Sequence, residues 1–284
     1  MSIHASPIKA GLRRWVAVFV LAAMAIPATR ARAADVPTCG AEVIATAAVA
    51  HVIDGRTFVL DDGREVRLAG IEVAPLPDTD GGQPAEAPSL RAKAALDSVL
   101  GGSTVTLKRL GAISDRYGRV LAQAFVAGEK GERWVQGEMV ASGYARVSPR
   151  NGDRACATAL IAGERAAREA KLGLWGEPVY ALQKAEDFAA VAQERGRFTL
   201  VEGKVLSVRE SGGTTYVNFG RRWSEDFTVT IAKRNVRLFT AAGLEPKKLQ
   251  GRVVRIRGWI EERGGPWVDA SRPEQIEVVE AKAK

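Results

Sequence analysis

Histidine and cysteine are scarce in this chain, and long apolar runs are absent. Its 284 residues include two histidines, His4 and His51, and two cysteines, Cys39 and Cys156. So little histidine excludes a His-rich metal site and leaves His51 as the one candidate histidine base after residue 33. No apolar run approaches the roughly 20 residues of a membrane span. The apolar fraction of 46% and the charged fraction of 26% are typical of a globular protein.

The first 33 residues differ from the rest of the chain. Lys9, Arg13 and Arg14 precede a short apolar run over residues 15–28, and Ala-Arg-Ala at residues 31–33 supplies small residues at the A-x-A spacing. This pattern is typical of a cleaved secretory signal. We therefore expect the protein to be exported, to a periplasm or outside the cell, with no membrane span in the mature chain. An uncleaved anchor is the alternative.

Removal of this segment changes the charge of the protein. The full chain has 41 basic and 33 acidic residues, a net charge of +8. Residues 1–33 hold five basic residues and no acidic ones, so 36 basic and 33 acidic residues remain, a net charge of +3. Residues 34–195 carry a net charge of −3 and residues 196–284 one of +6. The basic character of the mature chain therefore lies in its C-terminal part.

The two cysteines are expected to pair if the protein is exported. A bridge from Cys39 to Cys156 would tie the mature N-terminus to a later helix. Two separate buried thiols are the alternative.

The pattern after residue 41 predicts a small barrel. Residues 51–75 contain three short strands separated by turns at Asp54-Gly55 and at Asp61-Asp62-Gly63. Five short strands with a helix between the third and fourth are typical of an oligonucleotide/oligosaccharide-binding (OB) barrel. The remaining elements expected here are a helix from residue 88 to 100, strands at 104–110 and 120–126, and helices at 134–142 and 153–171.

A second set of strands is expected after a polar helical connector. Strand patterns return at residues 198–208, 214–219 and 227–231, a helix follows near 235–242, and further strands occupy 253–260 and 267–270. This order repeats the layout of the first barrel without a repeated sequence. The expected organisation is a signal at 1–33, a barrel domain at 34–176, a connector at 177–195 and a small OB-like β domain at 196–284.

Four segments of the first barrel carry a family resemblance. They are Val52-Ile-Asp-Gly-x-Thr57, Val66-Arg-Leu-Ala-Gly-Ile71, Asp115-x-Tyr-Gly-Arg-x-Leu-Ala122 and Lys171-Leu-Gly-Leu-Trp175. In this order and spacing the chain resembles the staphylococcal nuclease (thermonuclease) family. The resemblance implies a mainly β fold with α-helices, in which a five-stranded barrel carries three helices.

The resemblance also implies a chemistry. The family hydrolyses phosphodiester bonds of DNA and RNA with one calcium ion, two acidic metal ligands, a glutamate that activates water and two phosphate-binding arginines. By position, Arg67 and Arg119 match the catalytic arginines, and Asp54 and Glu72 fall at the metal site. The chain departs from the family at two places, because Arg56 replaces a metal-binding aspartate and Pro75 replaces the water-activating glutamate.

Three interpretations of this site remain open. In the first, a nuclease has a rebuilt site, in which Asp54 and Glu72 bind calcium and a later acidic residue acts as the base. The candidate bases are Asp78, Asp80 and Glu86. In the second, catalysis is lost, and Arg56, Arg67 and Arg119 form a metal-free site for single-stranded nucleic acid or a nucleotide phosphate.

The third interpretation is a structural or protein-interaction module. In it, Arg56 and Arg67 pair with Asp54 and Glu72. Whether the protein turns over a substrate, and its oligomeric state, are left open by the sequence.

The C-terminal part interleaves basic and aromatic residues, a composition that suits single-stranded nucleic acid. The best local candidates for a contact are Arg221, Arg222 and Trp223, which fall in an expected loop. The alternative is that the aromatic residues fill the core of a small barrel and the arginines form a solvated strand face.

Overall fold

A computed structural model describes Met1 and residues 39–40, 42–76, 87–129, 131–149, 154–222 and 224–279, without the side chains of residues 110–113. Within these residues no helix is both long enough and apolar enough to cross a membrane. Several predictions lie outside the described residues. They are the signal sequence, the candidate bases Asp78, Asp80 and Glu86, and the contact residue Trp223.

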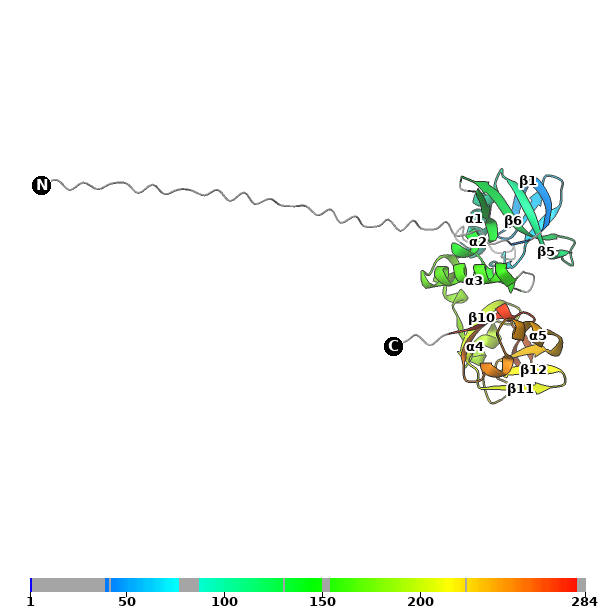
Figure 1. Ribbon diagram of the computed structural model, residues 1–284, viewed down its shortest axis with the longest axis vertical. Helices are drawn as coiled ribbons and strands as arrows, with labels where there is room; N and C mark the ends of the chain where they lie inside the picture. Colours follow the sequence, from blue (N-terminus) through cyan, green and yellow to red (C-terminus); the bar gives the residue numbers. More distant parts are fainter. Residues whose placement is uncertain are drawn as a thin grey trace. The chain divides into compact units, whose positions relative to one another are not determined.

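Five strands close the first barrel. They are β1 (Glu42–Asp54), β2 (Thr57–Leu60), β3 (Glu65–Leu68), β5 (Thr104–Ser114) and β6 (Val120–Gly128). The strands pair in the order β3-β2-β1-β5-β6, and β6 returns to β3 in parallel, which closes the circuit (Figure 1). β7 (Gly131–Trp134) extends the sheet beyond β6. The predicted five-stranded OB-like barrel is therefore confirmed.

Alternation along β2 and β3 decides which side chains fill this barrel. Phe58 and Leu60 on β2, and Val66 and Leu68 on β3, are at most 1% exposed. Successive residues of a strand point to opposite faces, so Arg67, between two core residues, is placed on the outer face. The same alternation that places apolar side chains in the core therefore places Arg67, a predicted site residue, on the outer face of the barrel.

Three helices accompany the barrel, as predicted: α1 (Pro88–Leu100), α2 (Val135–Ala141) and α3 (Arg154–Glu169). α1 buries Ala92, Leu96 and Leu100, which recur every four residues and so lie on one face of the helix. It packs closely against the turn between β1 and β2, where a Cβ on Gly55 would lie 2.7 Å from that of Ala92. A larger residue would force the turn away from the helix.

Cys39 and Cys156 form a disulfide, as predicted. Both residues are 1% exposed, and their Cα atoms lie 5.3 Å apart. Cys156 belongs to the first turn of α3, so the bond joins the chain just before β1 to that helix.

The second set of strands repeats the pairing circuit of the first. β12 (Thr214–Asn218) pairs with β11 (Ser207–Ser211) and β13 (Thr228–Ala232), and β13 pairs in parallel with β16 (Gly265–Asp269). β16 pairs with β15 (Glu261–Arg263), which directly follows β14 (Val253–Trp259) in the chain. β14 in turn pairs with β10 (Phe198–Lys204), and β10 leads into β11. α5 (Lys233–Ala241) follows β13, and β17 (Ile276–Val278) flanks β14. This part is OB-like, with its own hydrophobic core of Phe227, Val229, Ile231, Phe239, Ile256 and neighbouring residues.

The connector is more mixed than the predicted helix. A 3₁₀ helix at Gly173–Gly176 precedes it, and the connector itself contains a 3₁₀ helix at Pro178–Tyr180, the strand β9 (Gln183–Lys184) and the short helix α4 (Phe188–Gln193). β9 pairs in parallel with β10 and thereby covers an edge of the second barrel's four-stranded sheet. Its strand conformation comes from this long-range pairing, which the polar local sequence does not reveal.

A buried ion pair connects α3 of the first barrel with β14 of the second. Glu164 and Arg257 are both 0% exposed, and the Arg257 Nη1 atom lies 2.6 Å from a Glu164 carboxylate oxygen. Val147 completes the network, because its N–H donates to Glu164 at 2.7 Å and its carbonyl accepts from Arg257 at 3.3 Å. Val147 belongs to β8 (Arg146–Val147), which pairs with β4 (Ile71–Glu72).

Reduction of the disulfide is expected to destabilise the protein. The bond joins residues 117 positions apart, and closure of a loop of this size contributes up to about 4–5 kcal/mol in the chain-entropy model. Urea denaturation of Cys39→Ala/Cys156→Ala should therefore show a lower free energy of unfolding than the oxidised protein. An unchanged midpoint would contradict the expectation.

Removal of the buried guanidinium group of Arg257 is expected to destabilise the protein. Arg257→Met leaves the buried Glu164 with Arg168, 3.6 Å away, as its remaining cation, and should lower the free energy of unfolding by up to about 3–5 kcal/mol. Arg234→Met is the matched control, because Arg234 is exposed. Similar urea midpoints for the two variants would show that the ion pair does not support the fold.

Candidate functional site

Three predicted arginines gather at one end of the first barrel. Arg56 lies in the turn between β1 and β2, Arg67 lies on β3, and Arg119 immediately precedes β6. β3 is the common neighbour, because Arg67 pairs across the sheet with Thr57 of β2 and with Leu121 of β6. We refer to Arg56, Arg67 and Arg119 as the arginine cluster.

Glu72 on β4 is the carboxylate at the centre of this cluster. It is 8% exposed and forms an ion pair with Arg56, and its Oε1 atom lies 3.4 Å from Nη2 of Arg67. Asp54 has a different role, because its carboxylate accepts the backbone N–H of Arg56 at 2.8 Å and so fixes the turn. One carboxylate is thus shared by two guanidinium groups.

A tight turn positions Arg119. The Asp115 carboxylate accepts the backbone N–H groups of Tyr117 and Arg119 at 2.9 and 3.1 Å, and it accepts Nε of Arg119 at 2.8 Å. Gly118 adopts a φ of +80°, a conformation that glycine tolerates without strain. Burial raises the pKa of Asp115, but the hydrogen bonds from Arg119 and Tyr117 outweigh it, so the pKa lies below its usual value.

An exposed aromatic ring borders Arg119. Tyr117 is 66% exposed, and the guanidinium carbons of Arg116 and Arg119 lie 4.7 and 5.1 Å from its ring centroid. A flat ring beside a guanidinium group suits contact with a base next to a phosphate.

The arginine cluster is electrostatically strained. Burial, followed by the nearby charge of Arg67, lowers the pKa of Arg56 to about 10. Burial and then the charge of Arg119 also lower the pKa of Arg67. A bound anion would relieve the repulsion that lowers the pKa values of Arg56 and Arg67.

Comparison with known protein families agrees with this geometry. Residues 65–177 match the model of a family described as staphylococcal nuclease homologue. This part of the chain is therefore similar to the staphylococcal nuclease family. The match includes Arg67, Glu72 and Arg119, whereas the turn with Asp54 and Arg56 precedes it. A search of curated proteins found no match.

The described residues of the first barrel do not offer a fitting site for calcium. Calcium takes six to eight oxygen ligands, but the described residues contain no group of three or more histidine, cysteine, aspartate or glutamate side chains that could hold a metal. Glu72 already contacts two guanidinium groups, and Asp54 is occupied by the turn. Calcium binding by Asp54 and Glu72 stays an untested prediction that this donor set does not favour.

Sequence reasoning missed two residues around this site. Asp115, which holds Arg119, has a detectable signal, because aspartate followed three residues later by glycine is typical of such turns. Arg146 lies directly opposite Glu72 in the β4–β8 pair and has no comparable signal. It is 6% exposed, its guanidinium lies 5.0 Å from the ring centroid of Tyr180, and burial lowers its pKa to about 10.

The residues predicted to contact nucleic acid in the second barrel are not equivalent. Arg221 is exposed and lines a cavity of about 810 Å³. Arg222 instead lies 3.1 Å from Glu225, and its backbone N–H donates to Asp226. Trp223 lies outside the described residues. Tyr216, Arg263 and Trp267 line the same cavity as Arg221, and the sequence alone did not select them as contacts.

Neutralising Glu72 should change stability and anion binding in opposite directions. Glu72→Gln leaves Arg56 without its ion-pair partner, which should lower the free energy of unfolding by about 1–3 kcal/mol. Added phosphate should stabilise this variant more than the wild type, because the anion replaces the missing charge. Thermal melts with and without phosphate test both effects, with Glu65→Gln, an exposed carboxylate on β3, as control. Equal phosphate effects in all three proteins would contradict the expectation.

Proposed function

We propose that this chain is an exported protein that binds single-stranded nucleic acid and holds its backbone phosphates in the arginine cluster without a metal ion. The observation that carries the proposal is the position of Arg56. Its guanidinium pairs with Glu72, at the place where the family has a calcium ligand. A fixed cation thus stands where a bound cation would otherwise neutralise phosphate.

The accessibility of the cluster supports binding over a purely structural role. The side chains of Arg56, Arg67 and Arg119 are 16%, 22% and 18% exposed. Arginine presents five donors in a planar fork, so a guanidinium that contacts one carboxylate retains donors for a phosphate. The ion pairs to Glu72 are also what the structural interpretation predicts, and only a binding measurement separates the two.

Export is supported by two features. The N-terminal residues have the pattern of a secretory signal, and the disulfide between Cys39 and Cys156 suits an oxidising compartment. The family match favours a second candidate function. This is a calcium-dependent nuclease whose base comes from residues 77–86.

Fluorescence anisotropy with a labelled single-stranded oligonucleotide tests the proposal. Binding should be the same in calcium and in EDTA, and Arg67→Ala and Arg119→Ala should each weaken it about tenfold or more, as expected for a charged hydrogen bond. Each change should also reduce the slope of log affinity against log salt by about 0.7. Arg64→Ala is the matched control, because Arg64 is an exposed arginine of the same barrel that pairs with Asp62.

The outcomes separate the three interpretations. Calcium-dependent cleavage that both arginine changes abolish would identify a nuclease and overturn the metal-free proposal. Neither binding nor cleavage would leave the structural module. Equal affinities of the Arg64, Arg67 and Arg119 variants would place the binding site elsewhere in the protein.

A further inference from the structure

The second barrel carries a groove on the outer face of its five-stranded sheet. The cavity measures about 810 Å³ and lies over β11, β12, β13, β16 and the turn between β15 and β16. Its polar lining includes Ser207, Asn218 and Thr228, which occupy facing positions on three neighbouring strands. We call this cavity the aromatic groove, for the two rings described next.

Tyr216 and Trp267 form the floor of the groove. Their ring centroids lie 6.0 Å apart with the planes at 83°. Along β12, Thr215 and Val217 are buried, whereas Tyr216 between them is only partly buried. Alternation therefore places Tyr216 on the face opposite the core. The two rings line an open surface and are not part of the second barrel's hydrophobic core.

The charged residues that line the groove are all cationic. They are Arg209, Arg221 and Arg263. The Arg263 guanidinium lies 5.1 Å from the Trp267 ring centroid and pairs with Glu261, which does not line the groove. Arg209 and Arg221 have no ion-pair partner within the described part of the chain. The groove therefore combines cationic side chains with two partly exposed aromatic rings.

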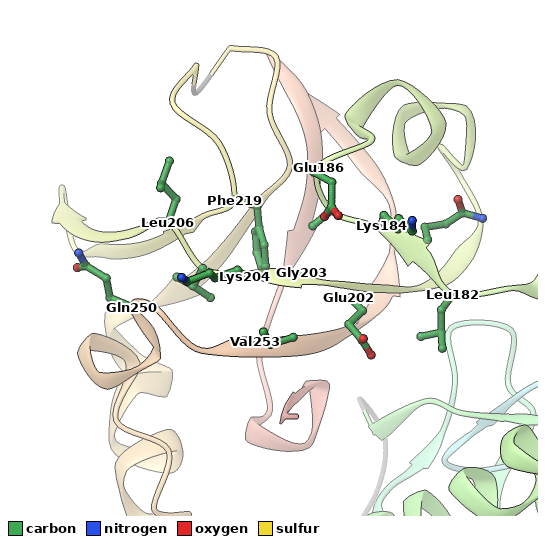
Figure 2. Close-up of a pocket in the computed structure, with 14 residues that line it drawn as sticks. Leu182, Lys184, Glu186, Glu202, Gly203, Lys204, Leu206, Phe219, Gln250 and Val253 are labelled. Carbon is green, nitrogen blue, oxygen red and sulfur yellow. The ribbon is translucent and has the colours of Figure 1, made fainter. Parts of the chain in front are cut away.

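Another cavity of the same barrel provides a contrast. It measures about 950 Å³ and lies along β9, β10 and β14. Figure 2 shows that Lys184 and Lys204 share this cavity with Glu186 and Glu202. Phe219 is its one aromatic lining residue and is 9% exposed. This cavity has two lysines balanced by two glutamates and no pair of aromatic rings. It therefore gives no comparable preference for an anionic, aromatic ligand.

We propose that the aromatic groove is a second binding site for single-stranded nucleic acid. Bases stack on Tyr216 and Trp267, and backbone phosphates contact Arg209, Arg221 and Arg263. The proposal rests on the proposed function for its class of ligand but uses none of the residues of the arginine cluster. A base-paired duplex hides the faces of its bases, so the groove selects single strands.

Binding should be measured in a protein whose first site is disabled. In the full chain with Arg67→Ala/Arg119→Ala, a labelled 12-nucleotide thymidine oligonucleotide should retain measurable affinity. Adding Tyr216→Leu or Trp267→Ala should weaken binding between about fivefold and a hundredfold, the range for loss of a stacked base. Adding Arg209→Gln/Arg263→Gln should reduce the salt slope by roughly 0.7 for each arginine.

Matched controls separate the groove from general charge and from misfolding. Lys204→Gln removes a cation from the other cavity, and Phe188→Ala removes an aromatic residue of α4 in the connector that is 37% exposed. Both should leave affinity unchanged. Tyr216→Phe keeps the ring and should bind as the parent does. Arg209→Gln and Arg263→Gln replace exposed side chains, so they test the proposal even if Trp267→Ala fails to fold.

Four results would overturn the proposal. Unchanged affinity and salt slope in the arginine variants would exclude the groove as the site. Equal binding of an abasic oligonucleotide or of heparin would show a site for polyanions without base stacking. Equal binding of the duplex would exclude selection of single strands. Loss of binding in the Arg67→Ala/Arg119→Ala parent, with full binding when the groove changes are made alone in the wild-type chain, would support the first site and overturn the second.

Discussion

The ion pair between Glu164 and Arg257 is the interaction on which the arrangement of the candidate site depends. Both side chains are fully buried, and both hold Val147, one through its N–H group and the other through its carbonyl. Val147 pairs with Ile71, the residue before Glu72. A cation of the second barrel thus supports, through β8, the strand that carries the central carboxylate of the arginine cluster. A residue of the second barrel therefore helps to hold β4 and β8 beside the arginine cluster.

Replacing a metal ion by a guanidinium changes the physical character of a phosphate site. Calcium exchanges with solvent, so a calcium site depends on the metal concentration around it. Arg56 is covalently part of the chain, and its planar group directs hydrogen bonds along fixed directions. In the proposed metal-free site, the cluster would be permanent and would lack the Lewis acidity that a metal would bring to hydrolysis. These properties suit retention of a nucleic acid better than its cleavage.

Local sequence signals predicted the barrels and the arginines well. Alternation and turn residues identify strands, and the spacing of Arg67 and Arg119 within recognisable segments singles out two arginines that the fold brings to one end of the barrel. The partners of these residues depend on distant pairing: Glu72 is placed by β8, and β9 becomes a strand only beside β10. Alternation also leaves open which face of a strand points inward. For this reason Tyr216 and Trp267 were compatible with core positions until the second core was seen.

The disulfide encloses the arginine cluster within a covalent ring. Every member of the cluster, with Glu72 and Asp115, lies between Cys39 and Cys156 in the sequence. A single peptide-bond cleavage inside this ring leaves the two fragments joined through sulfur, so neither can diffuse away. A nicked molecule therefore keeps Arg56, Arg67 and Arg119 covalently linked, and their retention no longer requires an unbroken backbone.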